Sequence, residues 1–252
     1  MRFERYVAIG DSSTEGMDDP DGAGGYRGWA NRLAETVARA QGGLLYANLA
    51  IRGKLTREIR DEQLGPALEM KPDLATVFAG SNDILKRRFD PAAVAEDVAA
   101  MHRSLVSAGA VVLTFTLPDL TGVMPIGRFL APRVRALNEA LRSAAASGGA
   151  RLVDFAAQPV SSDRRIWSDD RFHANAVGHA RIAAALARAL DLPGTDDAWN
   201  LPLPAERGGR LKRWTSDLGW WFRHLLPWHW IRPAHAPWVA KRPRLEPVRL
   251  PE

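Results

Sequence analysis

The stretch VAIGDSSTEGM (residues 7–17) begins as a short apolar run and then changes to glycine, aspartate and two adjacent serines. The apolar run predicts a buried β-strand, and the polar residues after it predict a tight turn. Asp and Ser are also good helix caps, so local structure is one explanation for their presence. The other explanation is chemical, because a serine at the carboxyl end of a strand is well placed to act as a nucleophile. The rest of the sequence has to discriminate between the two.

Further apolar runs follow this stretch and alternate with segments of helical periodicity. The predicted strands cover residues 5–10, 44–50, 74–80, 110–116 and 151–155, and the predicted helices cover residues 26–41, 56–70, 91–108, 131–147 and 175–190. Apolar strands separated by helices predict an α/β fold of three layers, in which helices cover both faces of a parallel sheet. Ligands of such sheets bind beyond the carboxyl ends of the strands, so the residues just after each strand are the candidates for a functional site.

The composition is that of a soluble globular protein, and it excludes several kinds of site. Of the 252 residues, 46% are hydrophobic and 25% are charged. The absence of cysteine excludes disulfides, thiolate metal sites and a cysteine nucleophile.

The chain enters its first predicted strand at once, which leaves no room for a signal peptide, and no apolar stretch approaches the ~20 residues that cross a bilayer. We therefore expect a cytoplasmic protein. Abundant alanine, and arginine in place of most lysine, suggest a bacterial genome rich in GC.

The charge and composition change near residue 191. Residues 192–252 carry a net charge of +4, against +1 for the first 191 residues, and they hold nine of the 17 prolines and seven of the nine tryptophans. A nearly neutral main part argues against nucleic-acid binding. We therefore predict a main domain over residues 1–191 and a basic, Pro/Trp-rich C-terminal extension over residues 192–252.

The extension contains one amphipathic segment. Between residues 210 and 225, six apolar side chains fall on one face of a predicted helix that Pro227 should end. They are Leu211, Trp214, Leu218, Trp221, Phe222 and Leu225. Three roles are open for this face: packing on the main domain, lying on an anionic membrane surface, or binding a partner. We expect packing on the main domain, because an exposed stripe of this size would promote aggregation.

Several segments at the predicted carboxyl ends of strands carry the groups that acyl transfer by serine requires. Ser12 follows the first strand and is the candidate nucleophile, and His173 is the candidate base. Asp170 lies three residues before this histidine, close enough to bind the other ring nitrogen. The backbone amides of Ser12 and Gly53 and the side-chain amide of Asn82 are three candidate donors to a developing oxyanion.

These residues resemble the four sequence blocks of the SGNH, or GDSL, hydrolases. The blocks are GDSS with Ser12, the glycine at 53, GSND with Asn82, and DDRFH with Asp170 and His173. They occur in the order of that family, and the resemblance covers roughly residues 5–190. It implies a flavodoxin-like, five-stranded parallel sheet and an esterase or lipase that uses neither metal nor cofactor. The implied reaction passes through an acyl-serine, and the implied substrate is a small-molecule ester, thioester or acylated sugar.

Some residues depart from the family pattern or have structural interpretations. The usual leucine after the nucleophile is Ser13 here, and the proline often found after the histidine is Ala174; both bear on the subfamily and not on the mechanism. We assign Ser12 as the nucleophile and Ser13 as a cap of the first helix, with the reverse assignment as the alternative, and Asp11 and Asp83 as groups that support the turns. The remaining candidates have structural interpretations as well: His102 and His179 as structural histidines, and the glycine-rich residues 21–28 as an entry loop without phosphate-loop spacing.

Two other functions remain open at this stage. An acyltransferase would use the same acyl-serine but offer it to an alcohol other than water. A non-catalytic module would dock on a membrane or partner through its tail, but such a module would be expected to have lost Ser12, Asn82 or His173, and all three are present. The motifs specify neither the acyl chain, nor the leaving group, nor the oligomeric state.

Overall fold

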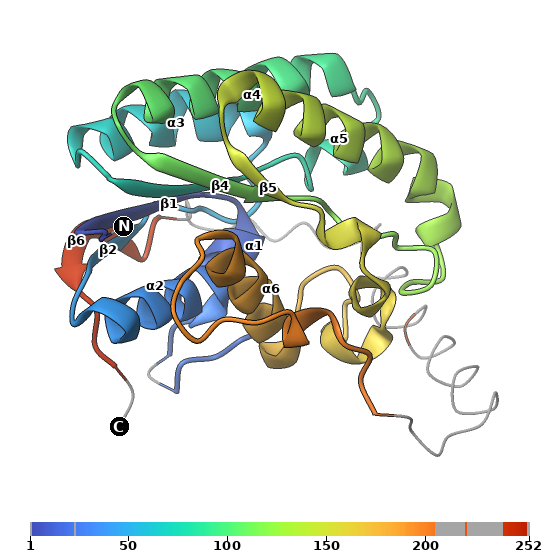
Figure 1. Ribbon diagram of the computed structural model, residues 1–252. Helices are drawn as coiled ribbons and strands as arrows, with labels where there is room; N and C mark the ends of the chain where they lie inside the picture. The colour runs from blue at the N-terminus through green and yellow to red at the C-terminus, as the bar shows by residue number, and fades with distance from the viewer. Residues whose placement is uncertain (1, 23, 205–219, 221–238, 251–252) are drawn as a thin grey trace.

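The computed structural model describes residues 2–22, 24–204, 220 and 239–250, and its centre is a six-stranded sheet (Figure 1). The strand order is β5–β4–β3–β1–β2–β6. The strands are β1 (Arg5–Gly10), β2 (Leu45–Asn48), β3 (Leu74–Phe78), β4 (Val111–Phe115), β5 (Arg151–Val153) and β6 (Arg242–Pro247). Strands β1 to β5 are parallel neighbours, and β6 runs antiparallel to β2.

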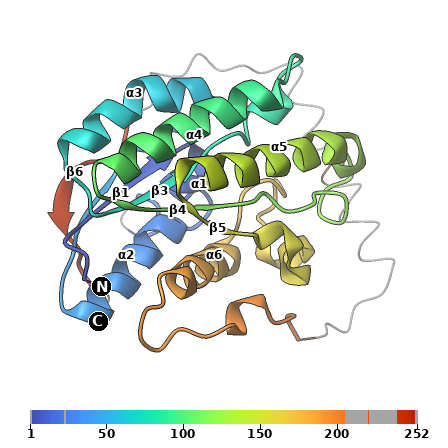
Figure 2. The ribbon, with the colours of Figure 1, turned by 45° about the horizontal axis from the view of Figure 1, so that its top comes forward.

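Helices cover both faces of this sheet. They are α1 (Ser12–Glu15), α2 (Gly28–Gln41), α3 (Thr56–Glu69), α4 (Pro91–Ser107), α5 (Gly127–Gly148) and α6 (Ala176–Ala189). Short 3₁₀ helices are η1 (Asp83–Leu85), η2 (Phe155–Ala157), η3 (Pro159–Ser162), η4 (Arg164–Ile166) and η5 (Ala198–Asn200). Figures 1 and 2 show α3, α4 and α5 on one face, and α2 and α6 on the other. The predicted three-layer α/β fold is confirmed, and the order β2–β1–β3–β4–β5 is that of flavodoxin-like sheets.

The five predicted parallel strands are present, and β6 extends the sheet by a sixth strand that the sequence analysis did not predict. Residues 242–247 read RPRLEP, which contains two prolines and has no apolar alternation. Edge strands tolerate prolines and charges, because one row of their backbone groups has no partner strand. The pairing runs from Leu45 opposite Pro247 to Asn48 opposite Arg242. Part of the C-terminal extension therefore packs on the sheet of the main domain.

Other boundaries differ from the predictions by a few residues. Helix α5 begins at Gly127, four residues before the predicted start, and β2 ends at Asn48, two residues before the predicted end. The predicted amphipathic helix over residues 210–225 lies outside the described residues, except for Trp220. No helix among the described residues has the length and apolar character needed to cross a membrane.

Helices α4 and α5 approach each other closely where Gly148 of α5 faces His102 of α4. His102 of α4 is fully buried there, and its Nδ1 lies 3.3 Å from the carbonyl oxygen of Ala144 on α5. Burial lowers the pKa of His102 to about 4, so its ring is neutral at physiological pH. At Gly148 on α5, an added Cβ would lie 2.5 Å from the Cβ of His102 and 3.2 Å from the carbonyl oxygen of Ala99. Gly148 therefore permits the close approach of the two helices.

We predict that Gly148→Ala lowers the free energy of unfolding by about 1–3 kcal/mol, because the added methyl group overpacks this interface. Urea denaturation followed by circular dichroism measures the change. Ser143→Ala is the matched control, because Ser143 lies on the exposed side of the same helix. It should be neutral or slightly stabilising, since alanine is the better helix former. Equal stability of the Gly148→Ala protein and the wild type would contradict this account of the interface.

Candidate active site

The first helix begins directly after β1 and places Ser12 at its amino terminus. Asp11 is the N-cap of α1, and its Oδ1 accepts a hydrogen bond of 2.9 Å from the backbone amide of Ser13. The prediction that Ser13 caps this helix is therefore wrong, because the carboxylate one residue before α1 fills that position. Ser13 instead directs its hydroxyl to Trp29, whose Nε1 lies 3.4 Å from it. Ser12 is 5% exposed, as expected for a reactive group at the base of a site.

Hydrogen bonds join Ser12, His173 and Asp170 in one chain. The Nε2 atom of His173 lies 2.8 Å from the Oγ of Ser12, and Nδ1 lies 2.6 Å from Oδ2 of Asp170. The serine and the histidine are 161 residues apart in the sequence. The structure therefore brings together the three residues that the sequence analysis selected as nucleophile, base and orienting acid.

The Asp170 carboxylate is held firmly by its own turn. Its Oδ1 accepts hydrogen bonds from the hydroxyl of Ser168 at 2.6 Å and from the backbone amides of Phe172 and His173, each at 2.9 Å. Burial opposes ionisation of Asp170, but hydrogen bonds and the charge of His173 outweigh burial and hold the pKa of this carboxyl below its usual range. Asp170 is therefore a fixed anion beside the imidazole.

The charges around His173 favour its protonated form. Burial favours the neutral ring, but the hydrogen bond and charge of Asp170 outweigh it, and Asp11 and Asp18 add to the effect. The net result is a pKa of His173 above the ordinary histidine value. Such surroundings stabilise the imidazolium that forms when a histidine takes a proton from serine.

The third carboxylate, Asp18, was not singled out from the sequence. It lies in the turn after α1 with a φ of 66°, a left-handed conformation that Asp tolerates better than most residues. Oxygens of Asp18 and Asp170 and a ring nitrogen of His173 lie within 4.8 Å of one another, which makes them the one group among the described residues with metal-ligand spacing. Both nitrogens of His173 already face Ser12 and Asp170, so a metal ion here would have to displace one of these contacts.

The candidate oxyanion donors lie on three adjacent loops. Gly53 has a φ of 79°, so a glycine fits the turn after β2, and no atom lies within 4 Å of the position where its Cβ would be. Asn82 donates from Nδ2 to the carbonyl oxygen of Lys54 at 3.0 Å, which fixes the GSND turn against that loop. Within the part of the chain that the structure describes, the backbone amides of Ser12 and Gly53 donate to no protein acceptor. Both amides are thus available to a ligand.

Two aspartates hold these loops together. The Oδ2 atom of Asp11 accepts hydrogen bonds from Ser81 and, at 3.3 Å, from Asn82. Asp83 accepts from both the backbone amide and the hydroxyl of Thr56, at 3.0 and 2.9 Å, and so joins the GSND turn to the start of α3. The supporting roles predicted for Asp11 and Asp83 agree with these contacts. Ser81 was missed, although its place within GSND was a usable signal.

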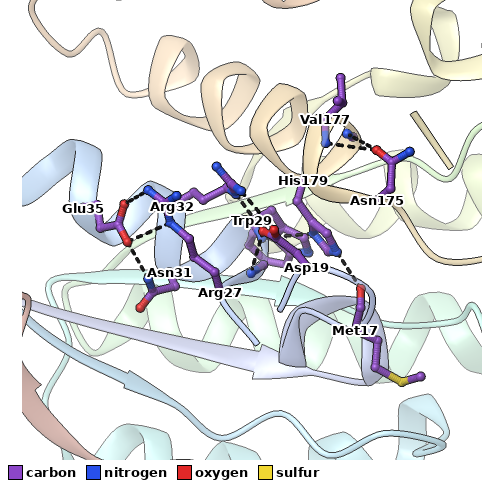
Figure 3. A network of polar contacts seen from close by, with 12 residues as sticks. Met17, Asp19, Arg27, Trp29, Asn31, Arg32, Glu35, Asn175, Val177 and His179 are labelled. Atoms are coloured by element: carbon purple, nitrogen blue, oxygen red, sulfur yellow. Dashed lines mark hydrogen bonds and ion pairs between the residues drawn. The ribbon is translucent and has the colours of Figure 1, made fainter. Parts of the chain in front are cut away.

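A buried polar network fixes α6 against the turn that follows α1 (Figure 3). The Nδ1 atom of His179 accepts the backbone amide of Trp29 at 3.0 Å, and Nε2 donates to the carbonyl oxygen of Met17 at 2.8 Å. Burial lowers the pKa of His179, in keeping with a neutral ring. In the same network, Asp19 accepts two hydrogen bonds from Arg32, at 2.7 and 2.9 Å. His179 therefore has the structural role that the sequence analysis gave it.

The turn of residues 168–174, which carries the candidate residues Asp170 and His173 and is called the catalytic turn below, is also fixed where it leads into α6. Asn175 caps this helix by accepting the amides of Val177 and Gly178, and its Nδ2 donates to the carbonyl oxygens of Arg165 and Trp167. Figure 3 shows Asn175 beside Val177 at the start of the helix. His173 lies two residues before this cap, so the cap restrains the position of the imidazole.

One described residue of the segment 210–225 reaches the catalytic turn. Trp220 is 4% exposed, and its Nε1 donates a hydrogen bond of 3.0 Å to the carbonyl oxygen of Asp170. The guanidinium of Arg171 lies 6.0 Å from the centre of its ring. Trp220 was not on the helical face selected from the sequence. The contact shows that the extension touches the main domain at the Asp170 turn.

Comparison with known proteins identifies the family but finds no curated relative. The model of the GDSL-like Lipase/Acylhydrolase family matches residues 8–181. A search of curated proteins gives no match. Among solved structures, TesA is 23% identical with a TM-score of 0.61, and the match covers 74% of this chain and 98% of that one. The lipase/acylhydrolase from Enterococcus faecalis is 22% identical with a TM-score of 0.60, over 79% of this chain and 100% of that one.

A third solved structure is that of a catalytic mutant of Axe2, an acetylxylan esterase from Geobacillus stearothermophilus. It is 15% identical with a TM-score of 0.62, and the match covers 79% of this chain and 97% of that one. At these identities the structures show a shared fold, whereas the family model matches well over half of the chain. The chain therefore belongs to the GDSL-like lipase/acylhydrolase family and is a carboxylic ester hydrolase.

Proposed function

We propose that the protein hydrolyses esters through an acyl intermediate on Ser12. The observation that carries this proposal is the unbroken hydrogen-bond chain from Ser12 through His173 to Asp170, with contacts of 2.8 and 2.6 Å. A nucleophile, a base within hydrogen-bond distance and a third group that orients the base are the parts that serine catalysis requires.

In the first half of the reaction, the Oγ of Ser12 attacks the ester carbonyl while Nε2 of His173 takes the hydroxyl proton. The C–O bond to the alcohol then breaks, and the imidazolium gives that proton to the leaving alkoxide. In the second half, water attacks the acyl-serine, His173 takes a proton from the water, and Ser12 recovers its proton as the acid leaves. Asp170 keeps the ring oriented and stabilises the imidazolium in both halves.

The oxyanion of each tetrahedral intermediate needs hydrogen-bond donors. We assign this role to the backbone amides of Ser12 and Gly53 and to the Nδ2 of Asn82, which would exchange its longer hydrogen bond, the 3.3 Å contact with Asp11, for one to the oxyanion. The Ser12 amide also lies at the amino terminus of α1, although this helix has only four residues and its dipole adds little. Asn82 is the one side chain among the three donors, so it is the donor that substitution can test.

We predict that Ser12→Ala and His173→Ala each lower kcat for a p-nitrophenyl ester by about 10⁴-fold or more, because members of a triad act as one unit. Ser13→Ala is the matched control, since Ser13 is the adjacent hydroxyl and should retain most of the activity. Circular dichroism verifies that each variant is folded. Full activity of Ser12→Ala, or loss of activity confined to Ser13→Ala, would refute the assignment of the nucleophile.

Asn82→Ala should lower kcat by about 10²–10³-fold with a much smaller change in KM, because the lost hydrogen bond forms in the transition state. Steady-state kinetics with the same ester measures both constants. Asn31→Ala provides a control for loss of an amide side chain elsewhere, since Asn31 contacts Glu35 and Arg242 outside the site. A rise in KM with unchanged kcat would show that Asn82 binds the substrate without stabilising the oxyanion.

The charges that face His173 predict the pH dependence. They are Asp170 from its own turn, Asp11 from the cap of α1, Asp18 from the following turn, and His179 from α6, which is neutral. The base must be neutral to act, so kcat/KM should rise with pH through an apparent pKa above the ordinary histidine value of about 6.5. Asp18→Asn should lower this apparent pKa, because it removes one of the charges that favour the imidazolium, and the change should be smaller at 1 M salt.

The kcat/KM profile from pH 5 to 9 tests this prediction. Asp119→Asn is the control, because Asp119 is exposed and is not among the groups that affect His173. A flat profile for the wild type, with chemistry shown to limit the rate, would exclude His173 as the base. An identical pKa in the wild type and in Asp18→Asn would show that Asp18 has no electrostatic role.

A further inference from the structure

A small apolar pocket lies directly beside the catalytic pair. Ser12 and His173 form part of its wall, and its open volume is about 20 Å³. The rest of the wall comes from α1, the carboxyl ends of β3 and β4, η2, the catalytic turn and α6. The other lining residues are Ser13, Phe78, Ser81, Phe115, Leu117, Pro118, Phe155, Trp167, Phe172, Ala174 and Ile182. None of these described residues is Lys, Arg, Asp or Glu, so the pocket suits an uncharged, apolar group.

The walls of the pocket are firmly held. The rings of Phe78 and Phe115 are stacked with their centres 4.2 Å apart. The backbone of Leu117 is bound at both ends by the side chain of Asn138, which accepts the amide of Leu117 at 2.8 Å and donates to its carbonyl oxygen at 2.6 Å. Trp167 is fixed by a hydrogen bond of 2.9 Å from its Nε1 to the carbonyl oxygen of Ser161. Enlarging the pocket would require the ring stacking or these hydrogen bonds to break.

The position of the pocket indicates which part of an ester it would hold. The oxyanion donors assigned above lie on the loops that follow β1, β2 and β3, whereas most of the pocket wall comes from beyond β3, towards β4 and β5. The alcohol leaves as it takes the proton from His173 and has to reach solvent. The acyl chain is therefore the part of the substrate that fits the apolar side of Ser12.

We propose that this pocket binds the acyl group and restricts the enzyme to very short acyl chains, with acetyl esters as the preferred class. The proposal rests on the proposed function, because it takes Ser12 as the nucleophile. A volume of about 20 Å³ leaves room for only a small group beside Ser12. The methyl group of an acetyl ester fits such a space, and propionyl is near its limit.

Packing energetics give the expected size of the effect. In a pocket with spare room, each added methylene would raise kcat/KM by about fourfold. Overpacking a rigid apolar site instead costs about 5- to 150-fold. Lengthening the acyl chain thus raises kcat/KM in an open groove and lowers it in a closed pocket. The dependence of kcat/KM on acyl length therefore distinguishes the two.

The test measures kcat/KM for p-nitrophenyl acetate, propionate, butyrate, hexanoate and octanoate. We expect acetate and propionate to be the best substrates, and butyrate and longer esters to be slower by about tenfold or more. Octanoate equal to or better than acetate would overturn the proposal while leaving the hydrolase function intact. If Ser12→Ala keeps its activity on every ester, the proposed function itself fails.

Substitution of one wall residue tests whether this pocket is what limits the length of the acyl chain. Leu117→Ala removes a side chain from the pocket while the Asn138 clamp on its backbone remains, so the ratio of butyrate to acetate activity should rise about tenfold. Leu120→Ala is the matched control, because Leu120 is also fully buried in the same loop but does not line the pocket. Its ratio should equal that of the wild type. The melting temperatures of the Leu117→Ala and Leu120→Ala proteins report their stability. If Leu117→Ala is unstable, Leu117→Val is the milder variant to measure. An unchanged ratio in a folded Leu117 variant would refute this location.

Discussion

The geometry of the candidate active site depends on how α6 is anchored to the turn that follows α1. His173 lies just before α6 and Ser12 begins α1, so their contact of 2.8 Å exists only if these two helices have one fixed relative position. His179 supplies that position, because its two ring nitrogens bind the backbone at Trp29 and at Met17. Unpaired buried polar groups are costly, so any other placement of α6 would leave the ring and these backbone groups without partners.

Asp11 fixes the other side of Ser12, against the GSND turn. One carboxylate oxygen caps α1 through the amide of Ser13, and the other accepts Ser81 and Asn82 from the GSND turn. Burial raises the pKa of Asp11, partly offset by these hydrogen bonds. A single buried side chain therefore joins the start of α1, with the proposed nucleophile Ser12, to a proposed oxyanion donor. The fold brings the loops to one edge of the sheet, and buried polar contacts set their final spacing.

The C-terminal extension contributes to the same domain in two places. Strand β6 pairs with β2 and so becomes the edge strand of the sheet. Trp220 donates a hydrogen bond to the carbonyl oxygen of Asp170. An uncovered edge strand is prone to pair with other chains, so β6 protects β2 from such pairing. The matches to the three solved structures named above cover 97–100% of those chains but only 74–79% of this chain. A membrane or partner role for the rest of the extension remains a hypothesis.

The sequence by itself determined the five parallel strands and the layer order, and it selected the residues of the candidate site. Buried strands must be apolar and chemistry gathers at their carboxyl ends, so GDSS and GSND could be placed without coordinates. Asp170 and His173 lie within one turn, so their pairing was local as well. Only the tertiary structure decided the contact between His173 and Ser12, the pairing of β6 and the volume of the apolar pocket. Periodicity shows that an element is buried but not which distant element covers it, and a cavity volume depends on packing from several such elements at once.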